Sequence, residues 1–186
     1  ETKNVITGEG GALLINDHEM IERAEIIREK GTDRSRFFRG EVDKYTWQEV
    51  GSSYLPGELI AAFLWAQLEE AEKITDELLR CWNRYNEILE PLESAGVIRR
   101  PIIPIECQHN AHMYYLLLPD LKKRTAFIHY LKERDIGAVF HYVPLHSSAM
   151  GLQVGRVHGR MDVTDNLSDR IVRLPLWIGL EKHLDE

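Results

Sequence analysis

The longest periodic stretch of the sequence lies between Pro56 and Pro91, and it limits how the rest of the chain can be arranged. Apolar residues recur there at helical spacing, from Leu59 through to Leu89. Pro56 suits the first turn of a helix, and Pro91 marks its end. The pattern predicts one long helix, or two helices in near-continuation, long enough to connect two lobes.

The residues before this helix predict a short apolar strand, one helix and a long loop. The apolar run Ala12 to Ile15 follows a group of glycines, and a helical pattern runs from about His18 to Lys30. Gly31 is expected to end that helix, since glycine adopts a positive φ without steric cost. Residues Thr32 to Ser53 show no periodicity and carry basic and aromatic side chains, which favours a functional loop.

The residues after the helix predict a smaller α/β lobe. Short strands are expected at 97–98 and 102–105, followed by a strand at Met113 to Leu118, a helix at Arg124 to Arg134 and a strand at Ala138 to Val143. These last three form a β-α-β unit. Residues 147–162 are expected to be irregular, and residues 163–171 could form a helix. Residues 174–177 are expected to pack as an apolar plug. The fold class is α/β, with boundaries at 1–57, 58–92 and 93–186.

Composition excludes several classes of protein. The longest apolar run, Leu59 to Ala66, is far shorter than the ~20 residues of a membrane span. The formal net charge is -7 and the basic residues are scattered, which argues against nucleic acid as a ligand. Cys81 and Cys107 show no metal or disulfide spacing. We therefore expect a soluble cytoplasmic protein with reduced thiols and no membrane insertion.

Lys3 is the first candidate for chemistry. A lysine amine is a useful nucleophile only when its pKa is depressed, and the turn residues Gly8, Gly10 and Gly11 with the apolar run behind them could fix it in a cleft. A solvated surface charge is the alternative. The chain begins two residues ahead of Lys3, so we expect it to be the back portion of a longer enzyme.

The sequence around Lys3 is similar to a known active-site segment. Residues 1–17, ETKNVITGEGGALLIND, resemble that segment in the pyridoxal-phosphate sugar aminotransferases of the DegT/DnrJ/EryC1/StrS family. In this family the lysine of a K-x-x-x-x-G-E-G-G motif forms the Schiff base. Further matches keep their order along the chain, namely GTDRSRFFRGEVDKYTWQEVGSSYL, AAFLWAQLE, NAHMYY and FHYVPLH.

The resemblance implies the C-terminal portion of a fold type I, aspartate-aminotransferase-like enzyme that acts as a homodimer. Lys3 would bind pyridoxal 5'-phosphate through a Schiff base. The cofactor would be converted to pyridoxamine phosphate as an intermediate of the reaction. The amino group of L-glutamate would be moved to C4 of dTDP-4-keto-6-deoxyglucose, for surface polysaccharides of the enterobacterial common antigen type. In this family most other cofactor ligands precede the lysine, so we expect the chain alone to be inactive.

The resemblance also implies further site residues. Ser53 lies where many relatives have the asparagine of Gly-x-Asn-Tyr, and its shorter hydroxyl can still donate to the cofactor phosphate. The expected substrate-binding residues are Arg34, Arg36, Arg39, Tyr45, His112, His141, Tyr142 and His146. The arginines suit a diphosphate. A solvated basic loop, loop packing and core histidines remain the alternatives.

Four other interpretations stay open or are disfavoured. No metal site is expected, because neither His109 with His112 nor His141 with His146 has helical spacing beside a carboxylate. The family's dehydratase branch replaces the lysine with histidine, which Lys3 argues against. A UDP- or GDP-linked ketosugar, or a non-catalytic folding or dimerisation module, remains possible.

Overall fold

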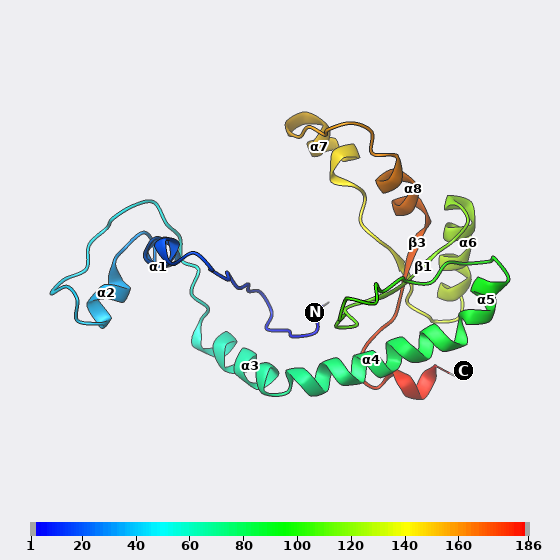
Figure 1. The fold of residues 1–186 in the computed structure, drawn as a ribbon, viewed down its shortest axis with the longest axis horizontal. Coiled ribbons are helices and arrows are strands. Elements are labelled where there is room, and N and C mark those ends of the chain that lie inside the picture. Colours follow the sequence, from blue (N-terminus) through cyan, green and yellow to red (C-terminus); the bar gives the residue numbers. More distant parts are fainter. Residues whose placement is uncertain (1–2, 185–186) are drawn as a thin grey trace. The chain divides into compact units, whose positions relative to one another are not determined.

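The computed structural model describes residues 3–184, which divide into two compact units (Figure 1). The first unit comprises residues 5–69, and the second comprises residues 3–4 and 70–184. The first contains a 3-10 helix η1 (His18–Met20), α1 (Ile21–Arg28), α2 (Arg34–Phe38) and α3 (Glu58–Glu69). The division between the two units falls at residues 69 and 70. The domain boundaries expected from the sequence, at residues 57 and 92, stay a prediction.

Helix α1 ends as the sequence predicts. Asp17 begins the helical segment by accepting a hydrogen bond from the backbone N–H of Glu19 at 3.0 Å. At the other end, Lys30 and Gly31 take positive φ values of 65° and 77°. The Gly31 N–H then donates to Ile26 O at 2.8 Å, which satisfies a carbonyl of the last turn. The expected stop at Gly31 is therefore confirmed.

The residues around Gly51 lie against the end of α1 and are held there by backbone hydrogen bonds. Gln48 N donates to Gly31 O at 2.7 Å, and Ser52 N donates to Ile27 O at 2.9 Å. An added Cβ at Gly31 would lie 1.7 Å from Glu49 O, and one at Gly51 would lie 2.2 Å from Gly31 N. Only glycine allows this close approach. The return of the loop to α1 thus depends on two glycines.

A buried carboxylate organises the loop between these two glycines. Asp33 is only 7% exposed. Its Oδ1 accepts from Thr46 N at 2.6 Å, and its Oδ2 accepts from Gln48 Nε2 at 3.1 Å. A buried carboxylate requires such partners, because its burial without them would be costly. The region predicted to be irregular is therefore ordered, and it also contains the short helix α2.

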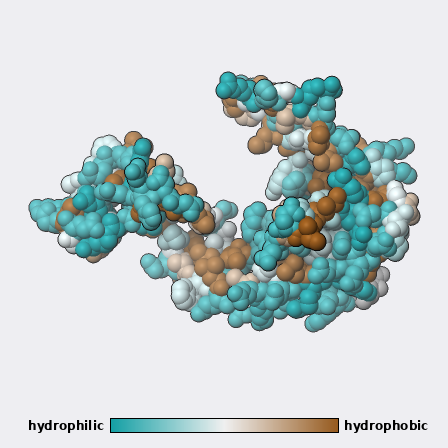
Figure 2. All heavy atoms as spheres, viewed as in Figure 1, coloured by the Kyte–Doolittle hydropathy of each residue, from teal (hydrophilic) through white to brown (hydrophobic). Residues whose placement is uncertain are grey.

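Helix α3 is apolar but exposed among the described residues. None of its residues is buried, and Leu59, Phe63 and Trp65 are 89%, 51% and 66% exposed. Figure 2 shows the resulting apolar surface over this helix. Thr7 Oγ1 donates to Ile60 O at 3.0 Å, so part of the N-terminal segment lies along it. An exposed apolar surface of this kind is typical of a region that packs against other protein.

The second unit combines helices with one small sheet. Its helices are α4 (Ala71–Ile88), α5 (Glu90–Ser94), α6 (Leu121–Lys132), η2 (Leu145–Ser147), α7 (Ala149–Val154), α8 (Asp162–Arg170) and η3 (Leu180–His183). Its strands are β1 (Tyr114–Leu117), β2 (Val139–Phe140) and β3 (Ile171–Leu174). No helix among residues 3–184 is both long and apolar enough to cross a membrane.

The strand order is β1-β3-β2, and β3 is antiparallel to both neighbours. The predicted β-α-β unit is present as β1-α6-β2 with its strands parallel, but these strands are not adjacent because β3 lies between them. The expected apolar plug at 174–177 in fact begins with the last residue of β3. The unit is a split β-α-β arrangement.

The core of the second unit lies between α4 and one face of the sheet. Tyr114 of β1 is fully buried and stacks on Tyr85 of α4, with ring centres 4.9 Å apart. Trp82 meets the same Tyr114 ring edge-on at 5.3 Å. Burial raises the pKa of both tyrosines to about 12. Leu116 and Val172 complete the buried face of the central strands.

Three strand predictions are wrong. Residues 12–15 form no strand, and Leu13 and Leu14 are 78% and 83% exposed. The predicted strands at 97–98 and 102–105 are also absent, although the adjacent Arg99 forms an isolated bridge with Leu117. A strand requires a hydrogen-bonded neighbour, and within residues 3–184 these segments lack one. The long helical pattern is present as α3 and α4, which are separated at Glu70.

The contact between Gly31 and Glu49 predicts a specific sensitivity to substitution. Gly31→Ala would combine an unfavourable positive φ with a clash against Glu49 O. Gly40→Ala is the matched control, because Gly40 has a φ of 74° and open space around it. The control should lose about 1–2 kcal/mol of unfolding free energy, and Gly31→Ala more than about 1 kcal/mol beyond that. Urea unfolding measures both, and equal losses would contradict the structure.

Candidate active site

Arg173 and Tyr115 lie on the face of the sheet that points away from the main core. Arg173 of β3 lies directly opposite Tyr115 of β1 and Val139 of β2. Because side chains alternate along a strand, these residues share the face opposite to Leu116 and Val172. The Arg173 Cζ atom lies 5.6 Å from the centre of the Tyr142 ring. This face therefore carries a guanidinium beside aromatic side chains.

Two buried polar atoms in this region have no hydrogen-bond partner. They are Nε of Arg173 and Nδ1 of His141, and the statement covers the described residues. The ring of His141 lies 5.1 Å from that of Tyr142, which also contacts Arg173. An unsatisfied buried polar atom costs about 1–3 kcal/mol. Such atoms in a native protein are often explained by a bound group.

Lys3 lies near the turn that leads into β1. The next residue, Asn4, donates a hydrogen bond from its side chain to Asn110 O, and the Asn110 side chain accepts one from His112 N at 3.2 Å. Between them, Ala111 is 1% exposed and has a φ of 50°, which is strained for a residue with a Cβ. Strain of this kind is concentrated at functional sites. The turn places His112 within electrostatic reach of Lys3.

The two histidines of this region have lowered pKa values. Burial is the main cause at His112, followed by the positive charges of Lys3 and Arg173. Burial also lowers the pKa of His141, and Arg173 adds to the effect. Both imidazoles are therefore neutral at neutral pH and can donate or accept a hydrogen bond. Perturbed titratable groups that gather in this way are typical of functional sites.

Two other histidines named from the sequence, His146 and His109, have structural partners. His146 Nε2 lies 2.9 Å from Asp165 Oδ1 of α8. His109 packs against Trp82 with ring centres 4.5 Å apart, and its Nδ1 accepts from Ala111 N at 3.3 Å. In the part of the chain that the structure describes, no three His, Cys, Asp or Glu side chains are grouped to hold a metal ion.

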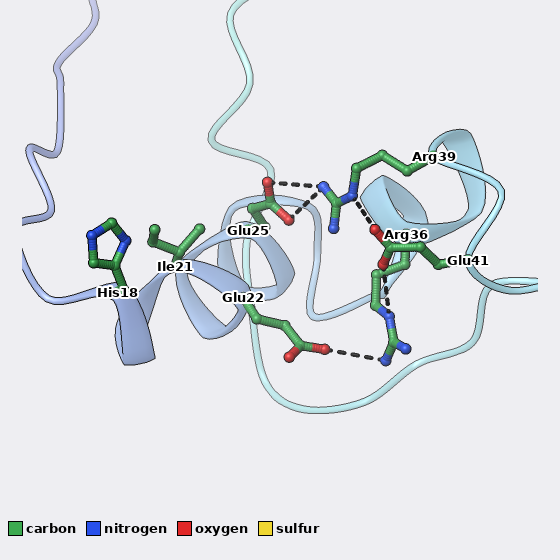
Figure 3. A pocket seen from close by; sticks show the side chains of 7 residues that line it. All are labelled: His18, Ile21, Glu22, Glu25, Arg36, Arg39 and Glu41. Carbon is green, nitrogen blue, oxygen red and sulfur yellow. Dashed lines mark hydrogen bonds and ion pairs between the residues drawn. The ribbon is translucent and has the colours of Figure 1, made fainter.

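The basic loop of the first unit contains arginines that are already paired with carboxylates. Arg36 contacts Glu22 at 3.1 Å, and Arg39 contacts Glu25 at 2.9 Å and Glu41 at 2.7 Å. The hydrogen bond from Arg39 is the main cause that lowers the pKa of Glu41. Figure 3 shows the shallow pocket lined by these groups, His18, Ile21, Glu22, Glu25, Arg36, Arg39 and Glu41.

The remaining predicted residues of the first unit have side chains without an ion pair among residues 3–184. Arg34 lies over the ring of Phe38 at 4.9 Å, and among residues 3–184 it forms no ion pair. Tyr45 meets Phe37 edge-on at 5.8 Å and is about half exposed. Ser53 is exposed, and its backbone bridges to Glu29 at the end of α1. Its hydroxyl has no partner in the described part of the chain.

Comparison with known proteins decides the family. The sequence model of the DegT/DnrJ/EryC1/StrS aminotransferase family matches residues 1–184 of the chain. The chain belongs to this family.

Two relatives illustrate the match to the DegT/DnrJ/EryC1/StrS family. The uncharacterized protein MJ1066 of Methanocaldococcus jannaschii is 34% identical over 151 residues, which cover 78% of this chain and 38% of the relative. The dTDP-4-dehydro-2,3,6-trideoxy-D-glucose 4-aminotransferase of Saccharopolyspora spinosa is 22% identical over 185 residues, 96% of this chain and 46% of that protein. The chain thus spans less than half the length of these relatives.

The structural match shows the fold. The aminotransferase TlmJ of Streptoalloteichus hindustanus superimposes with a TM-score of 0.79 at 21% identity, over 97% of this chain and 46% of that one. The chain therefore has the fold of the C-terminal portion of a fold type I, aspartate-aminotransferase-like enzyme, as the sequence predicts. Three other solved aminotransferase structures match the same fold, with TM-scores of 0.75 to 0.78.

The structure brings some of the predicted residues together and adds one. His141 and Tyr142 lie beside Arg173, and His112 is within electrostatic reach of Lys3 and Arg173. His146 belongs to the second unit but pairs with Asp165. The remaining predicted residues belong to the first unit, namely Ser53, Arg34, Arg36, Arg39 and Tyr45. Arg173 was missed, although a charged residue inside the apolar sequence IVRLPLW could have indicated it.

The charge of Lys3 predicts a measurable change at His112. Lys3→Met should raise the pKa of His112, because the loss of a nearby positive charge makes protonation easier. A pH titration of the histidine ring signals by NMR measures this, with Lys44→Met as the control for a lysine of the other unit.

The lowered pKa of His112 determines how the free energy of unfolding changes with pH. His112 binds its proton less readily in the folded than in the unfolded chain, so its contribution is complete above about pH 6.5 and is lost as the pH falls. An unchanged His112 titration in Lys3→Met would show that Lys3 does not act on this histidine.

Proposed function

We propose that the complete protein is a pyridoxal-phosphate-dependent aminotransferase for a nucleotide-linked ketosugar. It would move the amino group of L-glutamate to C4 of dTDP-4-keto-6-deoxyglucose and so form dTDP-4-amino-4,6-dideoxygalactose. The observation that carries the proposal is Lys3, which stands in the family's lysine motif and lies beside the strained turn at Ala111. We further propose a cytoplasmic homodimer that supplies a precursor for surface polysaccharides of the enterobacterial common antigen type.

The residues present fit the proposed cofactor. Lys3 is exposed, and among residues 3–184 its amine forms no ion pair, so it is available for a covalent link. The exposed hydroxyl of Ser53 can donate to a phosphate oxygen. When bound, pyridoxal phosphate supplies the electron sink that allows a proton to leave the carbon bearing the amino group. The chain's own residues supply position and proton transfer.

Each candidate residue has a definite task in this proposal. The Lys3 amine would hold the pyridoxal phosphate and would move a proton at the Cα atom of the donor. His112 and His141 are neutral and half-buried, so they can orient hydroxyl groups of the sugar without adding charge. Tyr142 is 71% exposed and offers an aromatic surface beside them. His146 is joined to Asp165 and supports the segment that carries His141.

The specific sugar rests on the sequence stretches that match in order, from GTDRSRFFRG to FHYVPLH. Family membership alone supports the broader activity, because relatives have names that refer to different sugars. A UDP- or GDP-linked ketosugar is therefore the main competing substrate.

Labelling and turnover test the proposal together. The complete protein with pyridoxal phosphate should be reduced by borohydride with one label on the peptide that contains Lys3, and Lys3→Arg should lose both label and amino transfer. A panel of dTDP-, UDP- and GDP-linked ketosugars with L-glutamate should show preference for dTDP-4-keto-6-deoxyglucose. An unlabelled Lys3 would refute the enzyme proposal and favour a folding or dimerisation module. Preference for another nucleotide sugar would refute the substrate.

The basic loop predicts an order of effects among its arginines. Arg34 has no ion pair within the described residues, whereas Arg39 is paired with Glu25 and Glu41. Arg34→Met should therefore raise the KM for the sugar nucleotide about 10-fold or more, the effect of losing one charge-assisted hydrogen bond. Arg39→Met should have the smaller effect, because its guanidinium is already neutralised. Steady-state kinetics on the complete enzyme measure both, and the reverse order would contradict the proposed role of Arg34.

A further inference from the structure

The segment that carries Lys3 groups with the second unit. Residues 3–4 belong to that unit by their contacts, whereas the residues that follow them, from Val5 on, belong to the first. The half-buried side chain of Asn4 donates a hydrogen bond to Asn110 O, 106 positions further along the chain. Among residues 3–184, residues 3–5 form no hydrogen bond between main-chain atoms. In the described part of the chain, the Asn4 side chain is therefore what attaches Lys3 to the second unit.

The acceptor of this hydrogen bond lies in a turn that the core holds in place. Ala111 is 1% exposed and has a φ of 50°. Its N–H donates to Nδ1 of His109 at 3.3 Å, and the His109 ring packs on the buried Trp82 of α4 with ring centres 4.5 Å apart. His112 N donates to Oδ1 of Asn110 at 3.2 Å. Asn110 O is therefore a fixed acceptor, because the residues after it and the residue before it are held by these contacts.

The glycines that follow Lys3 offer it no comparable support. Gly8 has a φ of 79°, and an added Cβ at Gly8 or Gly11 would meet no atom within 4 Å. Both glycines are exposed. These two positions are thus open to solvent, and the attachment of Lys3 depends on its immediate neighbour, Asn4.

We propose that Asn4 is a positioning residue, which holds Lys3 at the turn 109–112 and so keeps the Lys3 amine near the His112 ring. Consecutive Cα atoms are about 3.8 Å apart, so the anchoring of Asn4 confines the backbone of Lys3. The flexible side chain of lysine already gives its amine much freedom, and an unanchored backbone would add to it. Asn4 limits this freedom through one hydrogen bond to a rigid acceptor.

The charge of Lys3 reports where its amine lies. After burial, Lys3 is the largest cause of the lowered pKa of His112, and Arg173 of β3 is the next. Charges further apart than about 10 Å are largely screened at ordinary ionic strength. His112 therefore senses whether Asn4 keeps the lysine in place, whereas Arg173 acts on His112 from the sheet and does not depend on Asn4.

The consequence for the reaction rests on the proposed function. Lys3 would then be presented to the cofactor from the unit that also contains His112, His141 and Tyr142. A reacting group that is held in one orientation meets a lower barrier than one that must first be ordered. Asn4 would contribute in this way without touching the reacting atoms, because it acts only through Lys3.

The test is a double-mutant cycle on the complete protein before cofactor is added, with the pKa of His112 measured from its NMR ring signals. Asn4→Ala should raise this pKa as Lys3→Met does, because the positive charge is no longer held near the ring. The double variant should titrate like Lys3→Met alone, since without the charge Asn4 has nothing to position. Asn16→Ala is the matched control, because Asn16 is an exposed asparagine whose side chain forms no hydrogen bond among residues 3–184.

Two outcomes would overturn the inference. One is an unchanged pKa of His112 in Asn4→Ala, even if the free energy of unfolding falls, because that is what a purely structural role would give. The other is a shift in Asn4→Ala that adds in full to the shift in Lys3→Met, since Asn4 would then act on His112 by another route. If Asn4→Ala does not fold, the side-chain amide protons of Asn4 in the unmodified protein should exchange with solvent more slowly than those of Asn16, and equal rates would overturn it as well.

A labelling measurement separates the role of Asn4 from the proposed function. With limiting pyridoxal phosphate and borohydride, Asn4→Ala should label Lys3 about 3- to 10-fold more slowly than the unmodified protein, which is the effect of one net hydrogen bond. No label on Lys3 in the unmodified protein would refute the aminotransferase proposal and leave the His112 titration to decide on Asn4. Equal labelling rates in the two proteins would refute the role of Asn4 towards the cofactor, whether or not the protein transfers an amino group.

Discussion

The antiparallel pairing of β3 with both of its neighbours is the interaction on which the second unit depends. Through β3 the last part of the chain joins β1 to β2, which do not pair directly. The same four residues contribute Val172 to the core and Arg173 to the opposite face. The strand therefore stabilises the fold and positions the candidate site at once, so the chemistry of this face cannot be separated from the completeness of the sheet.

The sequence predicts the elements that depend on local patterns. The helical spacing after Pro56 and the stop at Gly31 follow from residues close together in the chain, and both are confirmed. The fold type follows from the family resemblance, and it is confirmed as well. Strand β3 has only four residues and is defined by partners more than 30 positions away, so no local pattern could indicate it. Residues 12–15 show the opposite error: their apolar character suggested a strand, but a strand also needs a neighbour to pair with.

The candidate site divides in the same way. Lys3, His141 and Tyr142 could be named from the sequence, because each lies in a short stretch that resembles a family motif. The pairing of Arg36 and Arg39 with glutamates, and the lack of any such partner for Arg173, could not be predicted, because they depend on which acids the fold brings near. Arg36 and Arg39 are neutralised within the protein, whereas the Nε–H of Arg173 has no acceptor among the described residues.

The close packing of the backbone at Gly31 and Gly51 determines which positions of the loop can change their side chain. The residues from Gln48 to Ser53 are held by main-chain hydrogen bonds and by the absence of two Cβ atoms, and not by their own side chains. A side chain at position 53 can therefore change without moving the backbone that carries it. Under the proposed function, the phosphate contact of Ser53 can therefore be varied by substitution without altering the fold that carries it.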